Sequence, residues 1–289
     1  MTDDTASPTN AVRGTITPLT LARYECNLYL PKQYAEQNNA HFPVAYLLGE
    51  SNIAPVMQIV EKQFCPPFIV LGIEAAAWET DFSPWPAAPL VKKSKPYTGG
   101  APAFLSLLQN EIKPYLDSHY RTLPSPEHTT IAGYSLAGLT TLFALYTTNF
   151  AHNFASMSGS LWYEGWIPFC EKQAAPFEKK ATETKNTTDY HLYLSLGNTE
   201  KNSRHQLMCK VDDCTQATLK LLEKQLHGTC GDTFPSNTLS NSSLHFTNTL
   251  FFEYNNGGHF NDISSRIAKG LAFLHKKYLY PADYLGATT

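Results

Sequence analysis

The most constraining feature of this chain is a β-type run that meets a helix-forming run at a turn of small residues. Residues 129–133 (TTIAG) favour a strand, and the uninterrupted run 136–146 (LAGLTTLFALY) favours a helix. The turn between them, GYSLAG (133–138), is a variant of G-x-S-x-G with Ala137 at the second glycine position. Small residues on both sides of the serine let strand and helix approach closely. The pattern predicts a nucleophile elbow that exposes the Ser135 hydroxyl at the carboxyl end of a sheet.

The same turn would place the backbone N–H of Leu136 at the start of a helix, where it can bind a developing oxyanion. A simpler interpretation is that Ser135 only caps an ordinary strand–helix connection, since short G-x-S-x-A matches arise by chance. The order of strand, turn and helix is the context that the motif requires, so it favours the nucleophile.

A general base for Ser135 is expected in a loop after the last core strand, because the order along such chains is serine, acid, histidine. His259 follows the predicted strand 245–254 within NNGGHF (255–260), and the two glycines let the loop bend back over the sheet edge. The other downstream histidines are less suitable. His245 and His275 lie inside predicted elements. His227 has no predicted strand before it, and His205 could instead line the site.

The acid is expected just after the predicted strand 191–198, where Glu200 is the nearest carboxylate in LGNTE (196–200). Its role would be to accept a hydrogen bond from the second imidazole nitrogen and to stabilise the imidazolium. Asp212 and Asp213 are alternatives near the next predicted helix, and Glu200 could also be solvated surface charge.

Strands and helices alternate along the rest of the chain. Two apolar runs, 42–49 and 66–74, are typical of buried strands, and 191–198 is also predicted as a strand. Residues 21–30 alternate as a half-exposed strand does. Further strands are predicted at 154–162 and 245–254, and helices at 53–63, 102–120 with a kink or restart at Pro114, 214–226 and 263–278. The alternation predicts an α/β fold with a mostly parallel, twisted sheet and helices on both faces.

Length and composition fit a single domain. With 289 residues, 43% hydrophobic and 16% charged, we expect one α/β domain over 15–289 after a flexible N-terminal segment, 1–14. Residues 75–102 are rich in proline and glycine, which predicts a long irregular loop. The tryptophans in that loop indicate that it is ordered and functional.

Charge and cysteine content exclude several classes. The net charge of −3 without a basic stripe disfavours nucleic acid as a partner. The N-terminus does not resemble a secretory signal, and no apolar run approaches the ~18 residues of a membrane helix, so a cytoplasmic protein is expected. The six cysteines form no C-x-x-C pair and are expected as reduced thiols, with a Cys209–Cys214 disulfide as the alternative. No H-E-x-x-H motif or close cluster of metal ligands is present.

Several motifs in order resemble the putative esterase family, which contains the enterobactin (siderophore) esterases and the esterase D-like S-formylglutathione hydrolases. They are FPVAYLLG, WETDFSPW, NEIKPYLDSHYRT, IAGYSLAGLTTLFALY, MSGSLW, YLSLGNTEKNSRH and GGHFND, spread over 42–274. The resemblance implies an α/β-hydrolase fold and hydrolysis of a small-molecule carboxylic ester without metal or cofactor. It supports Ser135 and His259 as catalytic residues and Glu200 as the acid, although some members use serine and histidine alone.

The resemblance also implies where the substrate would lie. The second oxyanion donor would come from residues 49–52, with Gly49 as the candidate, although this chain has Leu-Gly-Glu where relatives often have Leu-Asp-Gly. The loop that carries the tryptophans would overhang the site. Its expected walls, which could equally be core aromatics, are Trp78, Trp85, Tyr134 and Trp162.

Two other functions remain compatible with the sequence. An acyltransferase or thioesterase on the same fold would use the same residues with a different acceptor or substrate. A non-catalytic scaffold should have lost one member of the serine, acid and histidine set, and no such loss is visible. Neither the physiological ester nor the oligomeric state follows from the sequence.

Overall fold

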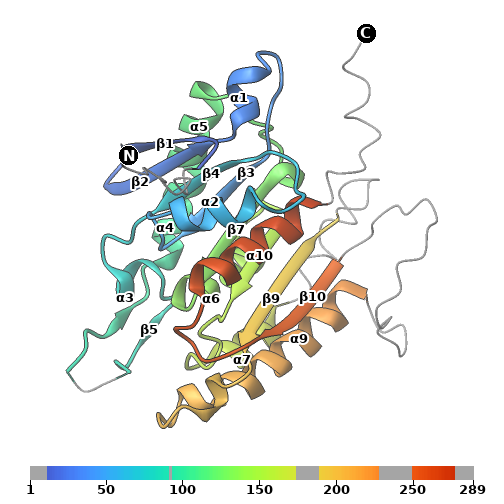
Figure 1. Ribbon diagram of the computed structural model, residues 1–289. Helices are drawn as coiled ribbons and strands as arrows, with labels where there is room; N and C mark the ends of the chain where they lie inside the picture. Colours follow the sequence, from blue (N-terminus) through green and yellow to red (C-terminus); the bar gives the residue numbers. More distant parts are fainter. Residues whose placement is uncertain (1–11, 91–92, 174–188, 228–248, 277–289) are drawn as a thin grey trace, which may run out of the picture.

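The structure is a computed structural model that describes residues 12–90, 93–173, 189–227 and 249–276 (Figure 1). Its described part is built around an eight-stranded sheet of order β1-β2-β4-β3-β7-β8-β9-β10. The strands are β1 (Thr15–Leu21), β2 (Tyr24–Leu30), β3 (Val44–Leu48), β4 (Ile69–Ile73), β7 (Thr129–Tyr134), β8 (Asn153–Met157), β9 (His191–Gly197) and β10 (Thr249–Asn255). From β4 to β10 all neighbours are parallel, whereas β1 and β2 are antiparallel. This confirms the predicted, mostly parallel α/β fold.

Helices cover both faces of the sheet. One face carries α2 (Ala54–Val60) and α10 (Ile263–Lys276), which lie side by side in Figure 1 and contact each other. The other face packs against α4 (Ala101–Leu107), α5 (Lys113–His119), α6 (Leu136–Thr147), α7 (Trp166–Lys172) and α9 (Val211–His227). The central strands are buried on both faces, so alternate residues of β3 belong to two different cores: Tyr46 faces the α6 side and Ala45 and Leu47 the α10 side. Burial on both faces explains why these strands are continuous apolar runs.

The predicted boundaries needed three corrections. The run 21–30 is not one strand but the end of β1, a tight turn and β2, because Ala22 adopts a left-handed conformation with φ 53°. The predicted strand 154–162 ends at Met157, since Ser158 has φ 46° and leaves the sheet. The loop 75–102 is not wholly irregular, because it contains the short helix α3 (Trp78–Asp81) and a ribbon of β5 (Pro86–Ala87) and β6 (Tyr97–Thr98).

The predicted interruption at Pro114 is confirmed. Between α4 and α5 the chain makes a π-helical turn, Leu108–Ile112, and Pro114 lies in the first turn of α5. Proline has no N–H to donate, and the wider turn accommodates this loss without ending the helical path.

The remaining expectations concern termini, cysteines and membranes. The N-terminal segment 1–14 lies almost wholly outside the described residues. The five described cysteines are free, so the alternative of a Cys209–Cys214 disulfide is wrong, and Cys230 lies outside the described residues. Within the described ranges, no helix combines the length and apolar character needed to cross a bilayer.

Candidate active site

Ser135 occupies a strained turn between β7 and α6. Its backbone has φ 58° and ψ −122°, a conformation that is costly for a residue with a side chain. The turn is possible because its neighbours are small: a Cβ at Gly133 would lie 2.4 Å from the carbonyl oxygen of Ala137. The structure therefore shows the tight strand–helix approach that the sequence motif predicts.

Three side chains from distant parts of the chain form a hydrogen-bonded series at the carboxyl ends of parallel strands. The Oγ of Ser135 lies 2.9 Å from Nε2 of His259, in the loop between β10 and α10. Nδ1 of His259 lies 2.8 Å from Oε2 of Glu200, in the short turn after β9. The structure thus brings together the three residues that the sequence singled out, in the order hydroxyl, imidazole, carboxylate.

Glu200 is buried, with 7% of its surface exposed, and every side-chain oxygen has a partner. Its Oε1 accepts hydrogen bonds from the Ser158 hydroxyl at 2.7 Å, from the Gly197 N–H at 2.7 Å and from Arg266 at 3.1 Å. Burial by itself would raise the pKa of this carboxyl. The hydrogen bonds from His259 and Ser158 outweigh burial and hold the pKa of Glu200 below its ordinary value. The arrangement therefore favours the ionised carboxylate beside His259.

Arg266 is the residue of the site that the sequence analysis missed. It comes from α10, is 1% exposed, and donates through Nη1 to Glu200, to the Ser158 hydroxyl at 3.0 Å and to the Tyr134 hydroxyl at 3.1 Å. Through Nη2 it donates to the carbonyls of Asn256 at 3.1 Å and Gly258 at 2.8 Å, in the loop that carries His259.

A signal for Arg266 was present in the sequence. The arginine interrupts the apolar face of α10, close to Ile263, Ile267 and Gly270 at helical spacing. A cation at such a position needs a buried anion as partner.

The oxyanion donors differ from the expectation in one respect. The N–H of Leu136 lies at the start of α6, as expected. The N–H of Gly49, however, donates to the Ile73 carbonyl at 2.8 Å and continues the ladder between β3 and β4. The N–H of Gly49 is therefore already paired within the sheet. The next N–H, that of Glu50, makes no hydrogen bond to the described part of the chain, and Glu50 lines the same pocket as Ser135.

A pocket of about 450 Å³ opens above Ser135 and is mainly apolar. Of the four expected wall residues, Trp78, Tyr134 and Trp162 line it. Trp85 does not: its Nε1 donates to the Glu164 carbonyl at 2.8 Å and its ring packs in an aromatic cluster beneath the loop. The pocket is also lined by Leu48, Glu50, Leu136, His259, Phe260 and Ile263.

The alternative acids and bases lie elsewhere. Nε2 of His205 lies 2.7 Å from the Leu90 carbonyl, and His275 stacks on Phe68 inside the α10 side of the core. Asp212 accepts a hydrogen bond from the Tyr254 hydroxyl at 2.5 Å. Asp213 and His227 belong to α9, and His245 lies outside the described residues. None of these observed partners is Ser135 or His259.

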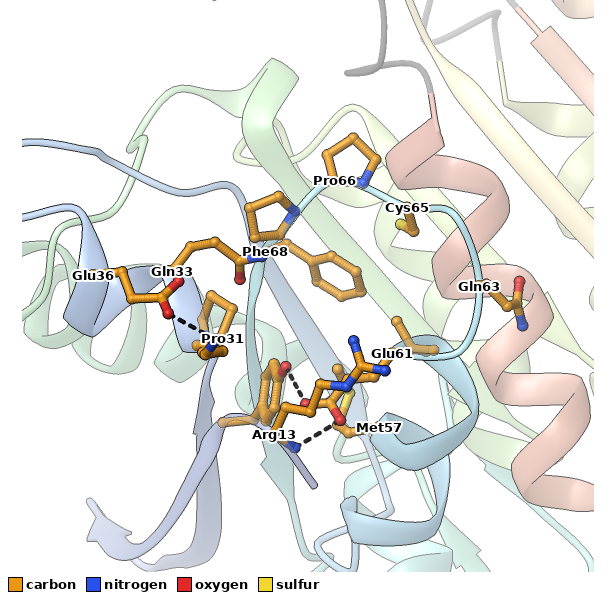
Figure 2. A pocket seen from close by; sticks show the side chains of 14 residues that line it. Arg13, Pro31, Gln33, Glu36, Met57, Glu61, Gln63, Cys65, Pro66 and Phe68 are labelled. Atoms are coloured by element: carbon orange, nitrogen blue, oxygen red, sulfur yellow. Dashed lines mark hydrogen bonds and ion pairs between the residues drawn. The ribbon is translucent and has the colours of Figure 1, made fainter. Parts of the chain in front are cut away.

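A second pocket, of about 230 Å³, lies at the opposite, amino-terminal end of the parallel strands (Figure 2). Figure 2 shows the Glu61 side chain in its lining, where the carboxylate accepts hydrogen bonds from the Tyr29 hydroxyl at 2.9 Å and from the N–H of Arg13 at 2.7 Å. Cys65 contributes a thiol to its lining, but no histidine is among the described residues there. This pocket does not offer the chemistry found around Ser135.

Comparisons with known proteins extend these observations. Over 160 residues the chain is 28% identical to the uncharacterized protein YbbA of Bacillus subtilis (strain 168), a match that covers 53% of this chain and 63% of that protein, less than two thirds of its length. Among solved structures, an IroE-like serine hydrolase from Shewanella oneidensis has a TM-score of 0.69 at 20% identity, with coverage of 93% of this chain and 82% of that one.

Two further structures share the fold. The siderophore hydrolase EstB from Aspergillus nidulans has a TM-score of 0.65 at 15% identity, and the match covers 96% of this chain and 98% of the EstB chain. The enterobactin esterase FES from Shigella flexneri has a TM-score of 0.55 at 19% identity, and the match covers 92% of this chain and 60% of the FES chain. The family described as Putative esterase matches residues 20–242, well over half of the sequence, and the chain therefore belongs to the putative esterase family.

Proposed function

We propose that this protein is a serine carboxylic-ester hydrolase that acts on a small-molecule ester through an acyl-enzyme on Ser135. Membership of an esterase family supports ester hydrolysis in general. The observation that carries the serine mechanism is the unbroken series of hydrogen bonds from Ser135 through His259 to Glu200. A hydroxyl paired with an imidazole that is itself oriented by a carboxylate is the arrangement that activates a serine nucleophile.

The first half of the reaction forms the acyl-enzyme. Nε2 of His259 takes the proton as Ser135 Oγ bonds to the ester carbonyl carbon, and the carbonyl electron pair moves onto its oxygen. The N–H groups of Leu136 and Glu50 stabilise that oxyanion, each contributing roughly 10²–10³ in rate. The tetrahedral intermediate then collapses, the bond to the alkoxy oxygen breaks, and His259 returns the proton to the leaving alcohol.

The second half repeats these steps with water. His259 accepts a proton from the water molecule as its oxygen attacks the acyl carbon, and then donates that proton to Ser135 Oγ as the acid leaves. Glu200 stays ionised throughout and stabilises the imidazolium in both halves. Every proton in this scheme moves between side chains of this chain, substrate and water.

The decisive experiment replaces the nucleophile. We expect Ser135→Ala to lower turnover of p-nitrophenyl acetate and butyrate by about 10³-fold or more. A fluorophosphonate probe should modify the wild-type protein at Ser135, mapped by peptide mass spectrometry, and not at Ser160, whose hydroxyl lies only 3.4 Å from that of Ser135.

Cys65→Ser, in the pocket at the other end of the sheet, is the matched control and should retain wild-type turnover. Wild-type turnover in Ser135→Ala would remove the proposal. A protein that binds the esters but neither hydrolyses them nor reacts with the probe would be the non-catalytic scaffold instead.

A further inference from the structure

A smaller hollow of about 250 Å³ lies beside His259 and adjoins the main pocket. The two hollows share His259, Trp162, Met208 and Phe260, but Ser135 and the two oxyanion donors line the main pocket and not the smaller hollow. We call the smaller hollow the shelf and define it by Trp162, Thr199, Asn202, Ser203, Met208 and Phe260. The division raises the question of which part of an ester each hollow would hold.

Proton transfer decides the orientation of the ester. Once His259 has taken the serine proton on Nε2, it must deliver that proton to the alkoxy oxygen, so this oxygen has to lie within hydrogen-bonding distance of the imidazole. The carbonyl oxygen has to lie against the N–H groups of Leu136 and Glu50, which line the main pocket. The alcohol portion therefore extends from the His259 side, where the shelf lies, and the acyl portion occupies the main pocket.

The linings of the two hollows differ in chemistry. The main pocket presents mostly apolar side chains, among them Leu48, Trp78 and Ile263. Thr199 and Asn202, from the turn after β9, line the shelf and carry a hydroxyl and an amide. Both residues are exposed, and neither side chain is hydrogen-bonded to any residue that the structure describes. Each is therefore available to bind a polar group.

We propose that the shelf binds the alcohol portion of the ester, and that the substrate joins an apolar acid to an alcohol bearing further hydroxyl or amide groups. This inference rests on the proposed function, because it uses the roles of Ser135 and His259. It goes beyond that function by assigning Thr199 and Asn202 to recognition of the leaving group.

The test uses two esters of one acid. Propyl butyrate and 1-monobutyrin share the butyryl group and a three-carbon alcohol, and they differ by two hydroxyls. Both form the same butyryl-enzyme, so a difference in kcat/KM between them arises before the alcohol leaves. Titration of the butyric acid released gives kcat/KM for both esters in the wild type and in Thr199→Val and Asn202→Leu, which remove hydrogen-bonding groups at similar volume.

We expect the ratio of kcat/KM, 1-monobutyrin over propyl butyrate, to exceed one in the wild type and to fall by about 2–10-fold in each variant, the effect of one lost hydrogen bond. Trp78→Leu is the matched variant in the main pocket. It should alter the preference between propyl acetate and propyl hexanoate and leave the alcohol ratio as it is. An alcohol ratio that stays at its wild-type value in the Thr199→Val, Asn202→Leu double variant would overturn the shelf assignment.

A second measurement needs no variant. With p-nitrophenyl butyrate as donor, the acyl-enzyme should pass its butyryl group to glycerol faster than to 1-propanol at equal concentration, because an acceptor alcohol enters where the leaving alcohol departs. Equal capture, or faster capture by 1-propanol, counts against the shelf. If either result contradicts the shelf while the probe still labels Ser135, the esterase proposal stands. If the wild type neither labels nor hydrolyses any ester, the proposed function itself fails.

Discussion

The two ends of the sheet each hold a nucleophilic side chain and a carboxylate within a pocket, but they connect them differently. At the carboxyl end, Ser135 is hydrogen-bonded to His259, which is hydrogen-bonded to Glu200. At the amino end, the carboxylate of Glu61 accepts from Tyr29 and from backbone N–H groups. The thiol of Cys65 has a different partner, the Ala272 carbonyl at 3.8 Å.

The difference shows that a reactive residue needs a path for its proton. Burial raises the pKa of Cys65 to about 12, so the thiol stays protonated near neutral pH although thiols are intrinsically better nucleophiles than hydroxyls. Ser135 has an imidazole at 2.9 Å that can accept its proton at the moment of attack. We infer that the hydrogen bonds at the amino end of the sheet stabilise the fold, whereas those at the carboxyl end make Ser135 reactive.

The largest effect expected from this comparison is on turnover, when each carboxylate is replaced by its amide. Glu200→Gln should lower kcat for p-nitrophenyl butyrate by about 10²–10⁴-fold, because an amide neither stabilises the imidazolium nor ensures the correct tautomer. Glu61→Gln should leave kcat unchanged and lower the unfolding free energy by about 1–3 kcal/mol, through weaker hydrogen bonds to Tyr29 and the backbone.

Steady-state kinetics and denaturant unfolding of both proteins measure the two effects. Nearly full activity in Glu200→Gln would mean that Ser135 and His259 suffice as a pair. Equal kinetic losses in both variants would erase the distinction between the two ends of the sheet.

A second prediction concerns the thiol. Since the pKa of Cys65 is raised to about 12 from 9.0, its thiolate fraction at pH 8 is lower by on the order of 10²–10³, and iodoacetamide should alkylate it more slowly by that factor than an unperturbed thiol. Peptide mass spectrometry of timed samples gives the rate, and the urea-unfolded protein provides the reference. Alkylation of the folded protein at the unfolded rate would contradict the burial argument.

A third prediction compares the arginines of the two ends. Arg266→Met leaves the buried carboxylate of Glu200 without its cation, and we expect the unfolding free energy to fall by about 3–5 kcal/mol. Arg266→Lys should lose less, because it keeps the charge but not the forked hydrogen bonds. Arg13 donates to Glu61 through its backbone N–H, which methionine retains, so Arg13→Met should change the unfolding free energy by less than about 0.5 kcal/mol. Similar losses of unfolding free energy in Arg266→Met and Arg13→Met would disprove the role of Arg266 as the cation that stabilises buried Glu200.

The smallest expected effect is on the pH dependence of stability. Because the pKa of Glu200 is lower in the folded protein than its ordinary value of 4.5, its ionisation stabilises the fold fully above that value, and this contribution is lost as pH falls through the folded pKa. The difference in unfolding free energy between the wild type and Glu200→Gln should therefore shrink as the pH falls below 4.5. A difference that does not shrink there would mean that the folded protein does not lower this pKa.

The fold and the order of the site residues were predictable because both depend on local patterns. Apolar runs bounded by turns indicate parallel strands, and the carboxyl ends of neighbouring parallel strands meet at one edge. A serine after β7, a glutamate after β9 and a histidine after β10 are therefore brought to the same edge by topology alone. The hairpin of β1 and β2 was missed because its turn at Ala22 and Arg23 contains none of the usual turn residues.

The sequence by itself determined the α/β architecture, the elbow at Ser135 and the loops from which its partners come, since strand periodicity and glycine spacing are properties of short segments. Only the tertiary structure decided that Gly49 donates to β4, that Trp85 supports the loop instead of lining the pocket, and that Arg266 neutralises Glu200. Each of these depends on the direction of one hydrogen bond between segments that meet only after folding. The identity of a buried group's partner is set by packing in three dimensions and leaves at most a faint local mark, such as a lone arginine on an apolar helix face.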